Sequence, residues 1–324
     1  IARAFCLLFL PFIHAVIEFS TDENLTSGIP YLFDTVIGGP LSAPVFMFAM
    51  GVNMIYGHSN FFRRGLVFLF IAYLFNICRY LLPYSAGFLI TGNYEKYISH
   101  LIYYVFANDI MQFAAAAMFT MALLKFLKIP DLIIFFISLL MLFASVNFNG
   151  IDFNNLPANI FLGYFVGTED QTGYLMTDFP LLNWFIFPVT GYLFGKILIH
   201  VKNKNYFYLL ISPACLIFTA IYFFYGIKLE TGMFGEGQNC YYHMIPRDVF
   251  ASLTGVIGVL GIWHMLTNFL PEKFLKLTHG ISSNTNSIYC IHWVILAWVT
   301  VFVYSFFNLE YLEAPVIKIG RAHV

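Results

Sequence analysis

The chain begins with IARAFCLLFLPFIHAVIEFS, residues 1–20, an apolar run that carries Arg3, His14 and Glu18. On an α-helix, which turns about 100° per residue, the three ionisable side chains fall on one face within roughly 60° of each other. Arg3 lies roughly 16 Å along the axis from His14, whereas His14 and Glu18 are about one turn apart. A charged side chain inside a bilayer is costly unless it faces a paired or wet interior, so this face is a candidate functional site.

The composition of the whole chain is that of a membrane protein. Of 324 residues, 60% are hydrophobic, 20% are aromatic and only 10% are charged, whereas about a quarter of the residues of a soluble domain are charged. The 16 basic and 17 acidic residues nearly balance and no nucleic-acid-binding motif occurs, so a nucleic-acid partner is not expected. The five cysteines are scattered singly, so neither a disulfide framework nor a metal site is indicated.

Apolar runs long enough to cross a hydrocarbon core of ~30 Å recur along the chain. Nine are found, at residues 4–20, 41–57, 65–82, 103–126, 131–148, 181–200, 206–226, 247–269 and 286–308. Shorter apolar pieces at 29–37, 81–90 and 156–166 are expected to be re-entrant or interfacial. The sequence therefore predicts an all-α integral membrane protein, a polytopic bundle of at least nine transmembrane helices.

Basic residues fall in every second loop, near residues 63–64, 125–128, 196–204 and 273–276, and acidic residues dominate the other loops. The positive-inside rule therefore predicts a cytoplasmic N-terminus. Residues 1–318 are expected to form a single transmembrane domain. Residues 319–324, IGRAHV, are encoded by one reading frame of a common sequencing-library adapter, and the chain starts within an apolar run without Met. We therefore expect truncation at both ends and ten or eleven helices in the full-length protein.

The residue types on the first helix suit group transfer. His14 can accept a proton near neutral pH, and Glu18 could orient its imidazole and stabilise the charged form. The alternatives are that His14 hydrogen-bonds a neighbouring helix and that Glu18 is interfacial, paired with a lysine. Arg3 is either a ligand-binding residue or an anchor at the cytoplasmic boundary.

Other polar residues recur at membrane depth. Asp109 and Gln112, in DIMQFAA, are spaced i, i+3 on the fourth predicted span, and Asp109 is a candidate member of the polar site. His292, in SSNTNSIYCIHWVIL, is either a second site histidine or a helix–helix hydrogen bond. NCYYHMIPRD places three polar residues just before the eighth span, His243, Arg247 and Asp248. They either face an extracytoplasmic acceptor or cap the helix and bind solvent.

Five stretches together resemble a known family. They are Arg3 with His14, LSAPVFMFAMGVNM, Arg63 with Arg64, DIMQFAA, and FPLLNWFIFPVTGYLFGKIL. In this order they resemble the bacterial relatives of heparan-alpha-glucosaminide N-acetyltransferase. SSNTNSIYCIHWVIL also resembles acyltransferase family 3, a related group of integral membrane O-acyltransferases.

The resemblance implies acyl transfer from a cytoplasmic acyl-CoA, usually acetyl-CoA, to a sugar amine or hydroxyl on the outer face of a bacterial inner (plasma) membrane. It implies that three arginines face the CoA phosphates, Arg3, Arg63 and Arg64. His14, with Asp109 or His292 nearby, would then deprotonate the acceptor or carry the acyl group itself. In the animal lysosomal enzyme of the first family, the catalytic histidine lies in the first luminal loop. The corresponding loop of this chain, residues 20–40, contains no histidine.

Two other functions compete with acyl transfer. In a transporter or flippase, the polar face of the first helix and Asp109 would form a proton or substrate path, although no repeated halves are recognisable. In a noncatalytic membrane scaffold, replacing His14 would disturb assembly and leave activity untouched. Acyl-CoA hydrolysis or transfer by the purified protein separates these possibilities.

Overall fold

The computed structural model describes residues 1–19, 42–57, 60–148, 150–168, 177–229, 232–234 and 241–307. Over these residues the secondary structure is helical, with two isolated parallel β-bridges, Asn108 with Thr177 and Ile151 with Thr168, and no strand. The prediction of an all-α integral membrane protein is confirmed. The predicted re-entrant piece at 29–37 lies outside the described residues, as does the adapter-like stretch at 319–324.

Within the described residues, five helical segments are long and apolar enough to cross a membrane. The first is Phe61–Thr91, and the others are Leu181–His200 (α12, Leu181–Trp184, and α13, Ile186–His200), α14 (Lys204–Leu229), α15 (Pro246–Leu266) and Thr285–Val303 of α17 (Thr285–Phe307). Shorter apolar helices occur in α1 (Ala2–Phe19), α4 (Ser42–Tyr56), α9 (Ile110–Phe126) and α10 (Asp131–Ser145). Together these segments overlap the nine predicted spans.

The predicted interfacial piece at 81–90 is wrong, because the structure continues the third span through it. α5 (Phe61–Asn76) runs without a break into a π-helical turn (Ile77–Leu81) and then into α6 (Leu82–Thr91), making a segment of 31 residues. Pro83 has no N–H, so it cannot continue the hydrogen-bond ladder from α6 back to the π turn at this position. Such π turns insert one residue into an α-helix and are frequent at functional sites.

The fourth predicted span, 103–126, is divided in the structure. The short helix α8 (Leu101–Val105) ends before α9 starts at Ile110. Asp109 caps α9, because its Oδ1 accepts a hydrogen bond from the Ile110 N–H at 2.6 Å and Gln112 Oε1 accepts one from the Asp109 N–H at 3.3 Å. The i, i+3 pair noticed in the sequence is thus a capping pair at a helix start.

The remaining helices are short or interfacial. They are α7 (Tyr94–Tyr97), α11 (Leu156–Gly163), the 3₁₀ turn Gly232–Phe234 and α16 (Glu272–Ser283). α11 is too short to cross a bilayer, as predicted for 156–166. α16 was not predicted; it is an amphipathic helix that carries Lys273 and Lys276 and joins α15 to α17.

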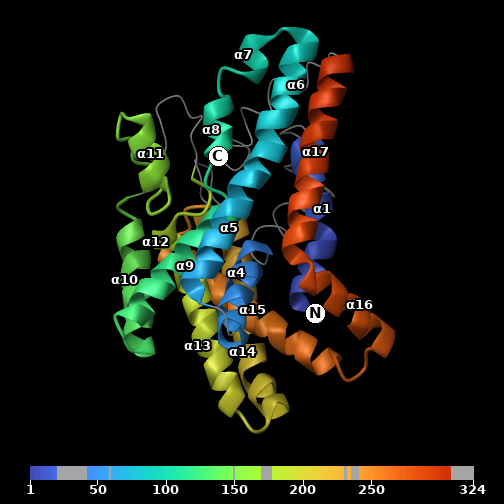
Figure 1. Ribbon diagram of the computed structural model, residues 1–324. Helices are drawn as coiled ribbons and strands as arrows, with labels where there is room; N and C mark the ends of the chain where they lie inside the picture. Colours follow the sequence, from blue (N-terminus) through green and yellow to red (C-terminus); the bar gives the residue numbers. More distant parts are fainter. Residues whose placement is uncertain are drawn as a thin grey trace.

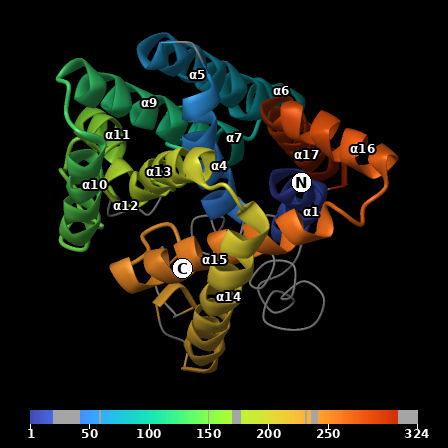
Figure 2. The ribbon, with the colours of Figure 1, turned by 90° about the horizontal axis from the view of Figure 1, so that it is seen from below.

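The helices pack in pairs that the sequence order does not reveal. α1 lies beside α17, α5 beside α9 and α14 beside α15, and α10 lies at the opposite edge of the molecule from α1 (Figures 1 and 2). α4 and α13 cross closely, since a Cβ added at Gly51 would overlap the Pro188 carbonyl and one at Gly191 would overlap that of Phe48. Small residues allow such close approach between membrane helices.

Candidate functional site

A cavity of about 390 Å³ runs between the helices that carry the predicted site residues. We call one part the arginine end; it is lined by Arg3, Asn53, Arg64, Thr285 and Asn286. We call the other part the acidic end; it is lined by Arg79, Asp109 and Asp178. His14 lies beside the acidic end, roughly 16 Å along α1 from Arg3.

The arginine end contains two of the three arginines predicted to face a ligand. Arg3 donates from Nε to Ser282 Oγ at 2.9 Å and from Nη2 to the Ser282 carbonyl at 2.5 Å, which ties the start of α1 to the end of α16. Arg64 lines the cavity, and its buried Nη1 has no hydrogen-bond partner among the described residues. Arg63, by contrast, has an exposed side chain and does not line the cavity.

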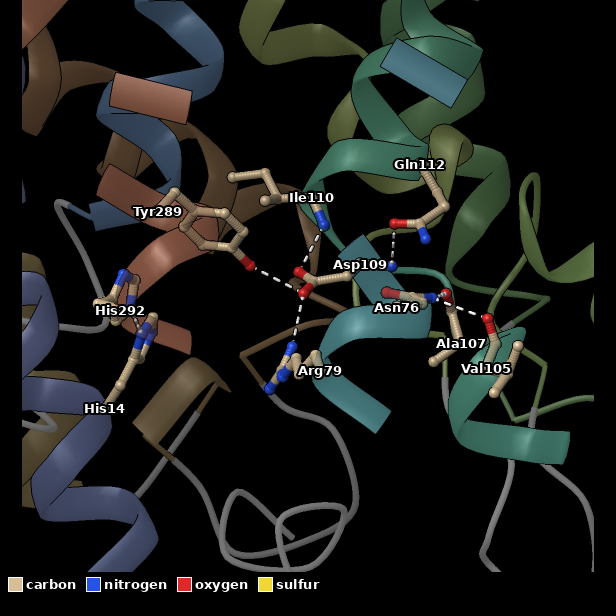
Figure 3. A network of polar contacts seen from close by, with 10 residues as sticks. All are labelled: His14, Asn76, Arg79, Val105, Ala107, Asp109, Ile110, Gln112, Tyr289 and His292. Carbon is tan, nitrogen blue, oxygen red and sulfur yellow. Dashed lines mark hydrogen bonds and ion pairs between the residues drawn. The ribbon is translucent and has the colours of Figure 1, made fainter. Parts of the chain in front are cut away.

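His14 and His292 form a direct pair across α1 and α17. His14 Nδ1 is 2.7 Å from His292 Nε2, and His292 Nδ1 is 2.8 Å from the Ile288 carbonyl oxygen (Figure 3). A carbonyl only accepts, so His292 Nδ1 carries the proton. With both rings neutral, His292 Nε2 accepts from His14 Nδ1–H, and the lone pair of His14 is on Nε2. The paired histidines thus leave His14 with a basic Nε2 atom.

Asp109 is the centre of a second polar cluster next to the histidines (Figure 3). Its Oδ2 accepts from Arg79 Nη1 at 3.1 Å and from the Tyr289 hydroxyl at 2.8 Å. Arg79 is 6% exposed and Asp109 is 9% exposed, so this ion pair is buried. Asn76 fixes the neighbouring backbone, because its Nδ2 donates to the carbonyls of Val105 at 2.9 Å and Ala107 at 3.3 Å. A buried ion pair with these additional hydrogen bonds meets the conditions under which such pairs are stable.

Trp293 connects the two clusters. Its ring centroid is 4.1 Å from that of His14, with the planes 27° apart, and 3.6 Å from Arg79 Cζ. At these distances the imidazole and the guanidinium would overlap if both lay on the same face of the indole. The indole therefore lies between them. Its Nε1 is buried without a hydrogen-bond partner among the described residues. The indole separates the Arg79 charge from His14 while holding both side chains in place.

Glu18 does not orient His14 as predicted. Its buried carboxylate accepts a hydrogen bond from Thr300 Oγ1 at 3.0 Å, and Glu18 is not among the cavity-lining residues. The partner of the imidazole is instead His292. Glu18 and Thr300 form a further link between α1 and α17.

His243 is held away from the cavity lining. It is buried before α15, and its Nε2 lies 3.0 Å from the Thr177 carbonyl oxygen. Burial lowers the pKa of His243 to about 4, so it is neutral at physiological pH. Asp248 caps α15, because its Oδ2 accepts from the Ile245 N–H at 3.2 Å. Asp248 thus follows the capping alternative, whereas His243 is buried and is not part of a solvated cap.

Sequence reasoning missed four residues of the site: Arg79, Asp178, Tyr289 and Trp293. Arg79 had a usable signal, since an arginine within the apolar run at 65–82 is costly in a bilayer and marks a functional site. Asp178 had none, because it is one of several acidic residues in its loop. In the described part of the chain, no group of three His, Cys, Asp or Glu side chains is arranged to hold a metal ion.

Comparison with known proteins identifies the family. Neither the curated proteins nor the solved structures yield a match to the chain. The family model for the acyltransferase domain of acyltransferase family 3 matches residues 1–317. This match agrees with one of the two resemblances seen in the sequence, and with the apolar helices and the histidine beside a long cavity. The chain therefore belongs to acyltransferase family 3, the integral membrane acyltransferases.

Proposed function

We propose that the protein transfers an acyl group, in the first instance acetyl, from acyl-CoA to a hydroxyl or amine of a sugar or glycan. The two substrates would enter from opposite ends of the cavity. One observation carries the proposal: a single cavity contains arginines at one end and, roughly 16 Å along α1, a histidine whose basic nitrogen is fixed by a second histidine. The sugar acceptor comes from the resemblance to the heparan-alpha-glucosaminide N-acetyltransferase relatives.

The arginine end suits the phosphates of CoA. The unpartnered Arg64 Nη1 is a donor for a charge-assisted hydrogen bond, and Arg3 is held in place by Ser282. An extended pantetheine arm would carry the thioester from these arginines towards His14. Between them the wall is largely apolar, with Leu7 and Leu10 of α1 facing the cavity.

His14 would act as the general base. As the acceptor oxygen or nitrogen attacks the thioester carbonyl, His14 Nε2 takes its proton, a C–O or C–N bond forms and the C–S bond breaks. The imidazolium then returns the proton to the thiolate, so that CoA leaves as the thiol. His292 would hold His14 in the required tautomer, and the Asp109–Arg79 pair would hold Trp293 against it.

An acyl group carried on His14 Nε2 is the alternative route. Mass spectrometry of the protein after acid quench, with acetyl-CoA present and acceptor omitted, distinguishes the two routes. Direct transfer leaves the mass of the protein unchanged, whereas an acyl-histidine adds one acetyl group.

The proposed orientation in the membrane rests on the basic residues near 63–64, 125–128, 196–204 and 273–276. The positive-inside rule supports a cytoplasmic arginine end, where CoA is available, and an acidic end towards the opposite side. A bacterial plasma membrane fits this arrangement.

Binding of labelled acetyl-CoA to the purified protein in nanodiscs tests the donor half of the proposal, with unlabelled CoA as competitor. We expect saturable binding that CoA displaces. Absence of binding by a well-folded sample would instead favour the transporter or flippase function.

The arginines provide matched variants for the same titration. We expect Arg64→Ala to weaken acetyl-CoA binding roughly 10- to 100-fold, the loss of a charge-assisted hydrogen bond, and Arg63→Ala to weaken it less. His14→Ala should bind acetyl-CoA but lose turnover. Equal effects of the two arginine variants would contradict binding of the phosphates inside the cavity.

A further inference from the structure

Asp178 is fixed beside Asp109 by the backbone. Thr177 forms the isolated parallel bridge with Asn108, and the Asp178 N–H donates to the Asn108 carbonyl at 3.1 Å. The residues that follow the bridged pair are Asp109 and Asp178, and both line the cavity. Two carboxylates from segments far apart in sequence thus meet at one end of the cavity.

The two carboxylates differ in their partners. Asp109 accepts hydrogen bonds from Arg79, Tyr289 and the Ile110 N–H. The partly buried Asp178 side chain receives no hydrogen bond from any described residue. Burial, together with the neighbouring Asp109, raises the pKa of Asp178 well above its ordinary value. A carboxylate withdrawn from water without a partner is unfavourable, so this site favours a ligand that supplies one.

Asp178 has no cation of its own among the described residues that line the acidic end. The positive charge there belongs to Arg79, which is already paired with Asp109. An ammonium group of a ligand would supply the missing positive charge.

Aromatic side chains complete the acidic end. Phe179, Phe234, Tyr241 and Tyr242 line the cavity with Asp178, and the rings of Phe179 and Tyr242 meet edge to face with centroids 5.3 Å apart. Aromatic faces attract ammonium groups and also pack against the apolar faces of sugar rings. A hydroxyl acceptor offers no charge to the Asp178 carboxyl, whereas an ammonium group stabilises its ionised form.

We propose that the acidic end is the acceptor subsite and that its acceptor is a primary amine, bound as the ammonium ion by Asp178 between the aromatic side chains. This inference rests on the proposed acyl transfer and narrows its acceptor from hydroxyl or amine to amine. The protein is then an N-acyltransferase, and Asp178 distinguishes an amine from the corresponding alcohol.

The proton balance needs both Asp178 and His14. The ammonium gives one proton to the Asp178 carboxylate and becomes the free amine. The amine nitrogen attacks the thioester carbonyl, the N–C bond forms, the C–S bond breaks and His14 Nε2 moves the second proton from nitrogen to the thiolate. The products are the amide, the thiol of CoA and one proton, which Asp178 releases to solvent.

The test measures the release of CoA thiol from acetyl-CoA by the full chain in nanodiscs, with matched acceptors. The probes are glucosamine against glucose and ethanolamine against ethylene glycol. We expect the amines to accelerate release at least tenfold more, in kcat/KM, than the alcohols. Asp178→Asn should remove that advantage, and Asp178→Glu should keep part of it because it retains the charge.

Glu95→Gln is the matched control, since it removes one exposed carboxylate from α7 and should preserve the amine preference. Equal acceleration by amines and alcohols in the unmodified protein, including none by either, would overturn the inference without any variant. An unchanged preference in a folded Asp178→Asn protein would also overturn it. Failure to bind acetyl-CoA would refute the proposed function itself, whereas binding and transfer without amine preference would refute the inference alone.

Discussion

At the scale of single residues, the proposed role of His14 as general base depends on the tautomer that His292 imposes. The Ile288 carbonyl fixes the proton on His292 Nδ1, and His292 Nε2 in turn fixes the proton on His14 Nδ1. This series of hydrogen bonds begins at the Ile288 carbonyl, which can only accept, and it determines that the lone pair of His14 is on Nε2. A side chain at position 292 that cannot accept a hydrogen bond would release His14 to either tautomer.

We therefore expect His292→Phe to lower kcat by up to about 10²- to 10⁴-fold, the usual contribution of a positioned general base, with little change in the Kd for acetyl-CoA. His292→Gln retains an accepting oxygen and should recover part of the rate. Steady-state kinetics combined with the binding titration separate the two quantities. An identical loss in both variants would show that the imidazole acts through packing against Trp293.

The buried ion pair predicts an asymmetry between single and double substitutions. Arg79→Met leaves the buried Asp109 carboxylate with the Tyr289 hydroxyl and the Ile110 N–H but without its cation, which should lower the free energy of unfolding by about 3–5 kcal/mol. Arg79→Met combined with Asp109→Leu should recover most of this loss without restoring activity. Equilibrium unfolding in detergent measures the free energy of unfolding of each variant.

The control for this comparison is Lys276→Met, which breaks the exposed Lys276–Glu272 pair in α16 and should change stability little. A stable Arg79→Met protein would mean that Asp109 finds another partner or becomes protonated. The comparison thus measures how much of the stability of the cluster around Asp109 depends on Arg79.

The sequence predicted several of these residues singly but not their contacts. Arg3, His14, Asp109 and His292 were recognised because polar groups are conspicuous in apolar runs. The His14–His292 bond joins residues 278 positions apart, a distance over which periodicity carries no information. Glu18 was assigned to His14 because i, i+4 residues share a helix face, but the hydrogen-bond donor to its carboxylate is Thr300 of α17.

At the scale of elements, the close crossing of α4 and α13 sets one wall of the cavity. Gly51 and Gly191 bring the backbones together, and α4 presents Phe46, Met47 and Met50 to the cavity. The two helices follow each other only after a long intervening stretch of chain. The short distance between α4 and α13 therefore depends on the absence of a side chain at Gly51 and at Gly191.

Gly191→Ala should push α13 from α4, because its Cβ would overlap the Phe48 carbonyl, and should reduce both the melting temperature and acetyl-CoA binding. Gly280→Ala is the matched control. It lies in α16 with no atom within 4 Å of an added Cβ, so it should be neutral or slightly stabilising, as alanine favours helix over glycine. A thermal shift assay in detergent compares the two; equal melting temperatures would contradict the tight crossing.

Helix positions were predictable because each span is apolar over its whole length. The errors occurred where a local feature interrupted that pattern. The π turn allowed α5 and α6 to continue as one segment, and the Asp109 cap divided the fourth span. α16 was missed because an amphipathic helix in the interface has no long apolar run.

At the scale of the whole molecule, the proposed function requires the two ends of the cavity to face opposite sides of the membrane. α7 lies at one end of the molecule and α16 at the other (Figure 1). Glu95 in α7 and Lys276 in α16 both have exposed side chains. They provide one labelling position at each end.

In a protein freed of its five native cysteines, Glu95→Cys should react with a membrane-impermeant maleimide added outside intact cells. Lys276→Cys should react only after the cells are opened. The measurement is the fraction labelled before and after lysis. The reverse pattern would place the arginine end outside, where CoA is not supplied, and would contradict the proposed direction of transfer.

The links from α1 to α16 and α17 also have a consequence for biogenesis. Arg3 binds Ser282, His14 binds His292 and Glu18 binds Thr300, so each polar group of the first helix finds its partner in the last helices described. Ribosomes add roughly 5–20 residues per second, so α1 waits on the order of tens of seconds in the bilayer before α17 emerges. During that interval the polar face of α1 needs a temporary polar environment, such as the insertion machinery or a water-filled space among the earlier helices. The candidate site is consequently among the last parts of the described chain to form.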